Sequence, residues 1–158
     1  MDCPICTNQI SDACVCTCMH HFCYPCLLQW INVKPVKTNK KIPNCPVCRQ
    51  SIYDIRFDRE FDNIIHGSEF PSFKHPNELV IDFQEKLDSL TIKNHDGPGV
   101  EIVRIIKTSV FYNAGLRKGH VLLFINNIPC NNHKSTVDII SHCQISRIPL
   151  IINTLTKI

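Results

Sequence analysis

Eight cysteine and histidine side chains near the start of the chain have the types and the spacing of metal ligands. Two Cys-x-x-Cys pairs, beginning at Cys3 and Cys45, flank a central Cys-x-His-x-x-Cys-x-x-Cys segment that runs from Cys18 to Cys26. Thiolate and imidazole are ligands that Zn²⁺ prefers, and a structural zinc site closes with four of them. The cluster therefore predicts two structural Zn²⁺ ions.

The first segment holds more cysteines than two zinc sites need, so the ligands have to be chosen. Nine of the eleven cysteines lie within residues 3–48, and seven are needed beside one histidine. Cys14 and Cys16 are predicted to be loop thiols, and one of them in place of Cys18 stays an alternative. His21 is so close to the next ligand that the chain has little room to turn, so we expect it to be a surface residue. The predicted ligands are Cys3, Cys6, Cys18, His20, Cys23, Cys26, Cys45 and Cys48.

Composition and charge narrow the class of protein. The chain has 158 residues, 44 % of them apolar, which is enough for one ordinary domain or two small ones. Seven ionised ligand thiols and two Zn²⁺ ions bring the formal charge of +3 close to zero, which argues against nucleic-acid binding. Apolar runs are far shorter than the ~20 residues of a membrane helix. Without the features of a signal peptide, clustered cysteines indicate an intracellular protein of the cytoplasm or nucleus, with no membrane contact.

The order of the ligands resembles the RING finger of ubiquitin ligases. Eleven residues separate the first pair from the central segment, and eighteen separate that segment from the last pair. The resemblance implies a cross-brace, in which one zinc ion binds Cys3, Cys6, Cys23 and Cys26, and the other binds Cys18, His20, Cys45 and Cys48. Spacing alone leaves sequential pairing open. In a cross-brace each metal joins distant segments. Zinc binding supplies on the order of 10 kcal/mol toward folding, which a domain with so small a core needs.

Residues between and after the ligands strengthen this resemblance. In the family, a ubiquitin-conjugating enzyme contacts an apolar residue in the first pair, an aromatic residue on the following helix and a proline in the last pair. Ile5, Trp30 and Pro46 hold these positions, and residues 27–31 have a helical pattern. A basic residue after the last ligand contacts the conjugating enzyme and ubiquitin in active ligases, and Arg49 stands there. Trp30 taken alone would equally well be a core residue.

A helix is predicted directly after the RING finger. Phe57, Phe61, Ile64 and Ile65 form an apolar stripe at helical spacing, and Asp58 precedes it as an N-cap. We expect this helix to pack on the RING finger. Residues 49–52 followed by such a helix are similar to the RING fingers of Topors and of herpesvirus immediate-early ligases.

The rest of the chain changes character. Residues 67–76 contain two prolines and a glycine and are predicted to be a linker, with which the zinc-rich part of the chain ends. The predicted domains are a RING finger (1–52), a post-RING helix and linker (53–76) and a C-terminal domain (77–158). Cys130 and Cys143 lie far from the cluster and are expected to be buried as small apolar side chains.

The C-terminal domain is rich in short β-type runs. They cover residues 79–83, 90–93, 100–106, 121–125 and 148–155. The turn signal at residues 96–99 predicts a hairpin between the second and third runs. A capping pair, Asn131 and Asn132, predicts a helix over residues 133–140. The predicted fold class is therefore α+β, a small two-zinc cross-brace followed by a β-barrel or sandwich with helical caps.

The segment from Ala114 to Asn127 resembles the most recognisable part of PDZ domains, and the resemblance extends over residues 77–158. Gly115 and Gly119 supply tight turns, and we expect little consequence from His120, which replaces the usual aspartate. The resemblance implies that a peptide C-terminus or an internal peptide binds beside an exposed strand edge and a helix. The predicted peptide-binding residues are Leu87, Ser89, Leu90, Thr91, Ile92, His133, Val137 and Ile140.

Two features of this peptide site leave alternatives open. The loop that binds a terminal carboxylate in the family has lost both glycines here, and Asp88 adds a charge that disfavours a carboxylate, against which Lys86 would act. His133 has the alternative role of merely starting the helix. The chain's tail, residues 156–158, has the type that such a groove accepts, which would give self-association. We favour the alternative that the tail ends the last strand.

Together the two resemblances predict an E3 ubiquitin-protein ligase. The RING finger would hold a charged ubiquitin-conjugating enzyme and orient its thioester, without covalent chemistry of its own, and the PDZ-like module would bind the substrate. Other catalytic motifs are absent from the sequence. The alternatives are a non-enzymatic zinc-dependent scaffold that joins two partners, and a zinc-dependent nucleic-acid binder, which the charge disfavours.

Overall fold

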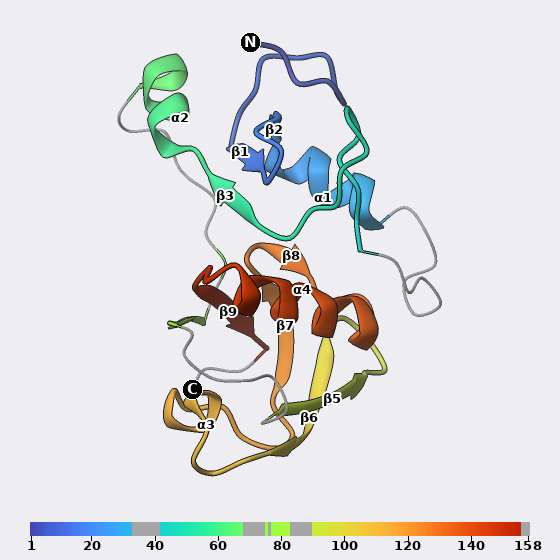
Figure 1. Cartoon of the computed structure of the whole chain (residues 1–158). Helices are drawn as coiled ribbons and strands as arrows, with labels where there is room; N and C mark the ends of the chain where they lie inside the picture. The colour runs from blue at the N-terminus through green and yellow to red at the C-terminus, as the bar shows by residue number, and fades with distance from the viewer. Residues whose placement is uncertain (33–41, 68–74, 76, 83–89, 156–158) are drawn as a thin grey trace. The chain divides into compact units, whose positions relative to one another are not determined.

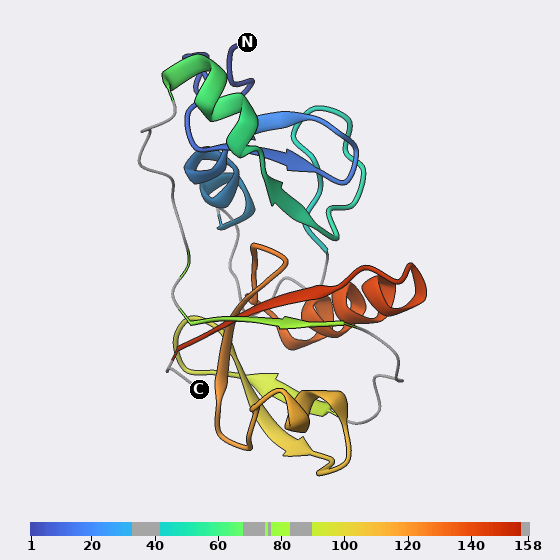
Figure 2. The ribbon, with the colours of Figure 1, turned by 90° about the vertical axis from the view of Figure 1, so that its left-hand side faces the viewer.

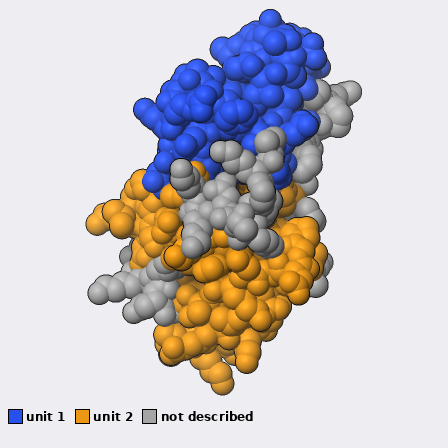
Figure 3. Space-filling view, turned by 90° about the vertical axis from the view of Figure 1, so that its right-hand side faces the viewer, with its two compact units in different colours: residues 1–34, 43–74 blue, residues 35–42, 75–158 orange. Residues whose placement is uncertain are grey.

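A computed structural model describes residues 1–32, 42–67, 75, 77–82 and 90–155. The chain forms two compact units, unit 1 (Met1–Lys34 and Pro43–Lys74) and unit 2 (Pro35–Ile42 and His75–Ile158), which Figure 3 colours blue and orange. None of the helices in the described ranges has the length and apolar character needed to cross a membrane.

Unit 1 combines a small antiparallel sheet with two helices (Figures 1 and 2). Its elements are β1 (Ala13–Cys16), β2 (His21–Cys23), α1 (Tyr24–Asn32), β3 (Ile55–Phe57) and α2 (Arg59–His66). The strand order is β2-β1-β3. Tyr24 and Leu27 of α1 are fully buried with Phe22 of β2, and the ring of Tyr24 meets Phe57 edge-on with centroids 4.7 Å apart. This core is small, so the unit depends on additional links between its segments.

The helix α2 packs on β1 as predicted, but through a carboxylate instead of an apolar stripe. Asp58 is its N-cap and accepts a hydrogen bond from the backbone of Phe61. Asp62 is fully buried, and its two carboxylate oxygens accept from the backbone N of Ala13 at 3.0 and 3.1 Å. The predicted stripe is wrong, because Phe57 belongs to β3 and Ile64 is 75 % exposed.

Unit 2 is a mixed structure built on a larger antiparallel sheet. Its elements are β4 (Glu78–Ile81), β5 (Leu90–Asn94), β6 (Val100–Ile105), α3 (Val110–Asn113), β7 (Val121–Ile125), β8 (Ile128–Pro129), α4 (His133–Ile145) and β9 (Leu150–Thr154). The strand order is β4-β9-β7-β6-β5, with β8 paired to β7. The core includes Ile102, Leu122, Ile140 and Ile152, all fully buried. The predicted α+β class is confirmed, and α4 continues beyond the predicted end at residue 140.

The predicted hairpin between β5 and β6 is present, and its turn requires a glycine. Gly99 has a φ of +96°, and a Cβ at this position would lie 2.6 Å from the carbonyl oxygen of Leu122. Only glycine fits so close a backbone approach. β5 forms the end of the sheet, with one edge unpaired among the described strands.

A buried asparagine joins three elements of unit 2. Asn126 and Asn127 have φ values of 50° and 65° and connect β7 to β8 in a two-residue turn. The Oδ1 atom of Asn126 accepts from the backbone of Ile151 in β9 at 2.8 Å, and its Nδ2 donates to the Sγ of Cys143 in α4 at 3.2 Å. Cys143 and Cys130 are buried, as predicted.

Candidate functional site

The eight predicted ligands meet as two groups of four in unit 1. The first group is Cys3, Cys6, Cys23 and Cys26, and the second is Cys18, His20, Cys45 and Cys48. Within each group the ligand atoms all lie within 4.8 Å of one another. This is the interleaved pairing, so the sequential alternative is wrong. Each site ties together segments that are distant in sequence.

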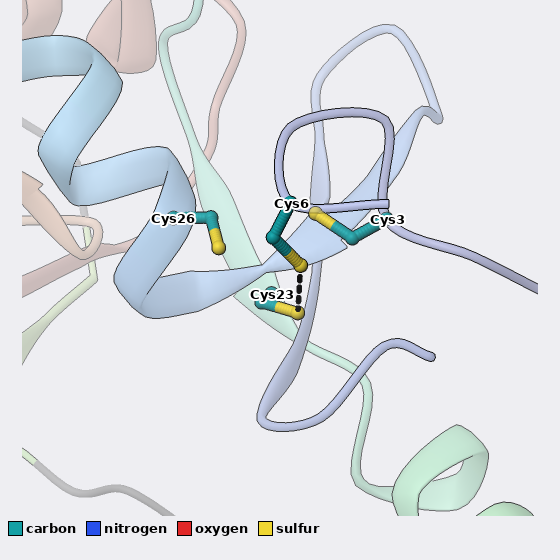
Figure 4. A group of neighbouring side chains, drawn as sticks. All are labelled: Cys3, Cys6, Cys23 and Cys26. Atoms are coloured by element: carbon teal, nitrogen blue, oxygen red, sulfur yellow. Dashed lines mark hydrogen bonds between the residues drawn. The ribbon is translucent and has the colours of Figure 1, made fainter. Parts of the chain in front are cut away.

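The first group lies where three parts of unit 1 converge. The loop before β1, the end of β2 and the first turn of α1 contribute its cysteines, whose side chains point toward one another (Figure 4). The sulfur atoms of Cys6 and Cys23 are 4.0 Å apart. Two Zn–S bonds at a tetrahedral angle place their sulfurs about 3.8 Å apart. Four thiolates in this arrangement fit a closed Zn²⁺ site that leaves no position for a water molecule.

The second group contains the single histidine ligand. The Nδ1 atom of His20 lies 3.3 Å from the sulfur of Cys18 and 3.6 Å from that of Cys45. Tetrahedral zinc places a nitrogen and a sulfur ligand about 3.6 Å apart. The geometry therefore fits Zn²⁺ and assigns Nδ1 as the ligand atom of His20. With four protein ligands, this site is structural too.

The two Cys-x-x-Cys pairs adopt the same turn. In each, the backbone N of the first cysteine donates to the carbonyl oxygen five residues later, at 2.8 Å. Thr7 and Arg49 follow the second cysteines and have φ values of 65° and 67°. Residues with a Cβ seldom adopt this conformation, so the zinc turn fixes where the exposed side chain of Arg49 begins.

The two spare thiols have a different environment from the predicted one. Cys14 and Cys16 were expected in a loop, but both lie in β1 and are buried. Burial raises the pKa of both thiols, so they stay protonated and behave as small apolar side chains. His21 belongs to neither group of ligands, as predicted; its side chain is 22 % exposed, and its Nε2 lies 3.0 Å from Asp58. Because β1 has only four residues, the sequence shows no clear alternation of buried and exposed side chains that would reveal a strand at Cys14 and Cys16.

The residues predicted to contact a conjugating enzyme are placed by the zinc sites. Trp30 of α1 is 40 % exposed, and its Nε1 donates to the carbonyl oxygen of Asn44 at 3.0 Å, which holds the indole beside the loop of Pro46. Ile5 lies between two ligands of the first site, and Cys26 of that site precedes Trp30 by one helical turn. Ile5 and Pro46 are half-buried. The sequence interpretation missed Val47, which is 49 % exposed within the second zinc turn.

The predicted peptide site is described in part. Leu87 and Ser89, like Lys86 and Asp88, lie outside the described residues, as does the tail at 156–158. Leu90 and Ile92 are 7 % exposed on β5, whereas Thr91 faces solvent. Val137 of α4 is half-buried, and Ile140 is fully buried in the core.

His133, the first residue of α4, is held against β5 by a residue that the sequence interpretation missed. The Oδ1 atom of Asn94 accepts from the backbone N of His133 at 2.9 Å and lies 3.1 Å from its Nδ1. An atom that accepts from a backbone N–H must be the amide oxygen, so Nδ1 donates to it. The neutral ring of His133 then carries its lone pair on Nε2.

Comparison with known proteins finds relatives for the zinc-binding segment. Residues 3–48 match the family of C3HC4-type zinc fingers, the RING fingers. The E3 ubiquitin-protein ligase RMA3 of Arabidopsis thaliana is 40 % identical over 53 residues, which cover 32 % of this chain and 22 % of the relative. The E3 ubiquitin-protein ligase RNF5 of Homo sapiens is 37 % identical over 51 residues, with 32 % and 26 % covered. The chain thus spans about a quarter of the length of these relatives.

A solved structure is similar to about half of this chain. It is described as the structure of the dmPar3 PDZ1 domain in complex with the dmPar6 PBM. It covers 53 % of this chain and 98 % of its own, at 19 % identity and a TM-score of 0.42. A likeness of this size carries no inference about binding, so the predicted peptide site stays a prediction.

Proposed function

Because residues 3–48 form a RING finger of the C3HC4 type, we propose that the protein is an E3 ubiquitin-protein ligase. The observation that carries the proposal is that apolar side chains are exposed next to the zinc cross-brace. Trp30 and Val47 are 40 % and 49 % exposed, although the core of unit 1 is short of apolar residues. Exposed apolar side chains that cluster at a rigid site are typical of a binding surface.

The proposed mechanism is catalysis by orientation. Both zinc sites have four protein ligands, so the metal supplies structure and offers no position to activate water. The surface formed by Ile5, Trp30, Pro46 and Val47 would bind a ubiquitin-conjugating enzyme that carries ubiquitin as a thioester. Arg49, fixed at its backbone by the second zinc turn, would contact the enzyme and ubiquitin together and hold the thioester in the geometry that a lysine attacks.

Replacing Ile5 with alanine is expected to slow discharge of a ubiquitin-loaded conjugating enzyme by about tenfold, because a central apolar anchor of the contact is lost. The measurement is release of ubiquitin to free lysine by the zinc-loaded chain, across a panel of conjugating enzymes. Ile64→Ala is the matched control, because Ile64 is a 75 % exposed isoleucine on α2 outside the proposed surface. Arg49→Ala should lower the rate while leaving affinity for the conjugating enzyme nearly unchanged.

The same assay separates the ligase from a non-enzymatic scaffold. A scaffold would bind partners but would not accelerate discharge with any enzyme of the panel, and that result would refute the proposal. Equal losses in Ile5→Ala and Ile64→Ala would also contradict it, because the exposed surface beside the cross-brace would then have no special role.

We further propose that unit 2 selects the substrate by binding a peptide along β5. The edge of β5 that is unpaired among the described strands offers backbone groups for strand addition. The Nε2 atom of His133 is the acceptor in its neutral ring, so it suits a serine or threonine hydroxyl that donates. The PDZ-like role, the similarity to Topors and herpesvirus ligases, and a cytoplasmic or nuclear location all stay proposals.

A peptide that ends in Thr-Lys-Ile, the sequence of the chain's own tail, is expected to bind the intact protein about tenfold more weakly when His133 is replaced by alanine. Titration calorimetry measures the affinity, and His142→Ala on the same helix is the control. Changing the peptide threonine to alanine should cause a loss that does not add to that of His133→Ala. If amidation of the peptide's C-terminus left the affinity unchanged, the site would bind an internal peptide. If the losses from His133→Ala and from the peptide's threonine-to-alanine change were fully additive, the proposed contact between the histidine and the threonine would be contradicted.

A further inference from the structure

We propose that unit 2 contains a second binding site, a basic hollow that takes a compact ligand bearing two or more phosphate groups. The hollow lies beside α3 and the end of β6, which are neighbours in both Figures 1 and 2. It has a volume of about 470 Å³ and is lined by Val103, Arg104, Ile105, Lys107, Tyr112, Arg117 and Lys118. None of these residues belongs to the predicted peptide site, so the proposal is independent of the proposed function.

The charge of the hollow is one-sided. Among the residues that the structure describes, its lining includes four lysines and arginines and no aspartate or glutamate. Residues 75–158 hold nine lysines and arginines in all, so nearly half of them converge on this hollow. Within the described part of the chain, none of the four has a carboxylate partner, whereas Lys93 on the neighbouring strand pairs with Glu101 at 3.2 Å. Four uncompensated cations repel one another and favour the binding of a multivalent anion.

One wall of the hollow is organised before any ligand binds. The guanidinium of Arg117 lies 3.6 Å from the centre of the Tyr112 ring, and its Nη1 donates to the carbonyl oxygens of Tyr112 and Leu116 at 2.7 and 2.8 Å. A side chain held in this way loses little freedom on binding. The cation–π stack on Tyr112 also fixes the aromatic part of the lining.

The turn that carries Arg117 and Lys118 is fixed as well. The backbone N of His120 donates to the carbonyl oxygen of Arg117 at 3.1 Å, and Gly119 has the positive φ of 91° that such a turn needs. The Nδ1 atom of His120 accepts from the backbone N of Arg117 at 3.0 Å. The histidine thus closes this turn, and positions both cations at the rim of the hollow.

The dimensions and lining favour a small phosphorylated ring over other anions. A hollow of about 470 Å³ lies in the range of pockets for small molecules and is too small for a folded segment or a duplex. Val103, Ile105 and Tyr112 provide apolar surface for the face of a ring, and the cations around them suit phosphate oxygens. The shared chemistry is that of a polyphosphorylated inositol, either free or as the headgroup of a membrane lipid.

The test uses the whole zinc-loaded chain and inositol 1,4,5-trisphosphate as the probe. Calorimetric titration is expected to show saturable one-to-one binding that weakens as salt is added. The double variant Lys107→Gln, Lys118→Gln should bind about tenfold more weakly, because two exposed charge contacts are lost. Lys134→Gln is the matched control, because Lys134 is an exposed lysine of α4 outside the hollow. This variant should bind the trisphosphate with the same affinity as the unchanged chain.

The other arms separate the sources of the ligand. Co-flotation with vesicles that contain phosphatidylinositol 4,5-bisphosphate, but not with phosphatidylserine vesicles of equal charge, would support the lipid headgroup. Binding of the soluble trisphosphate without co-flotation would support a free ligand. The proposal is overturned by absence of saturable binding, by an equal loss in Lys134→Gln, or by binding of an acidic peptide in place of the trisphosphate. Amide NMR spectra of the variants establish that the fold is kept.

Discussion

Replacing Cys45 with serine is expected to unfold unit 1 while unit 2 stays folded. Cys45 is fully buried and joins the last zinc turn to Cys18 and His20. A structural zinc site contributes on the order of 10 kcal/mol to folding, which is comparable to the whole net stability of an ordinary domain, about 5–15 kcal/mol. Amide NMR of the full chain should show that the dispersed signals of unit 1 collapse and those of unit 2 persist, and mass spectrometry should count fewer than two zinc ions.

Cys16→Ala is the control for this loss. Cys16 is as buried as Cys45 but belongs to neither group of ligands. Its replacement should retain two zinc ions, and we expect a cost of only about 1 kcal/mol from the small cavity. If Cys45→Ser kept both metals, or if Cys16→Ala lost one, a ligand set that includes Cys16 would replace the one described above.

The ligands of unit 1 could be predicted because metal coordination requires ligands at short, characteristic spacings in the sequence. Pairs such as Cys3 and Cys6 must be close in sequence to fold around one ion, and that spacing is visible in the chain. The interleaving could not be derived in the same way. It depends on the hairpin of β1 and β2, which brings Cys23 to the first site and leaves Cys18 and His20 at the second.

The errors in unit 1 have a common physical origin. The face on which α2 packs was predicted from apolar spacing, whereas the helix is anchored by the buried carboxylate of Asp62 on the backbone of Ala13. The four residues of β1 are too few to show an alternating pattern, so the sequence predicts a loop at Cys14 and Cys16 where the structure has a strand. In both cases the deciding partner is a backbone group from a segment distant in sequence, which no local pattern encodes.

In unit 2, the features that depend on local turns could be predicted from the sequence, whereas the contacts between distant residues could not. The turn at Gly99 and the helix after Asn132 were predictable, because their backbone needs appear within a few residues. The hydrogen bonds from His133 to Asn94 join residues 39 positions apart. The cations of the basic hollow are likewise separated in sequence, and only the path of the chain around α3 brings Arg104 and Lys118 to one surface.

The stability of unit 2 is expected to fall as the pH decreases from about 6.5 to about 4, because of His75. The ring of this buried histidine stacks on Phe124 with centroids 3.9 Å apart, and burial lowers its pKa from 6.5 to about 4. In this pH window the unfolded chain binds a proton that the folded chain does not, so unfolding gains free energy. The full shift corresponds to roughly 3 kcal/mol. Native-state hydrogen exchange of core amides of unit 2, such as Leu122, measures the change separately from acid loss of zinc in unit 1.

His75→Phe isolates this contribution, because phenylalanine keeps the stack on Phe124 and cannot bind a proton. The substitution also changes packing, so the informative quantity is the change in protection between pH 7 and pH 4 and not the absolute stability. We expect that change to be smaller than in the unchanged chain by about 3 kcal/mol, with the difference developing between pH 6.5 and 4. Equal changes in the two proteins would show that His75 binds a proton as readily when folded as when unfolded. Its neutral, buried state would then not be the reason that unit 2 weakens in acid.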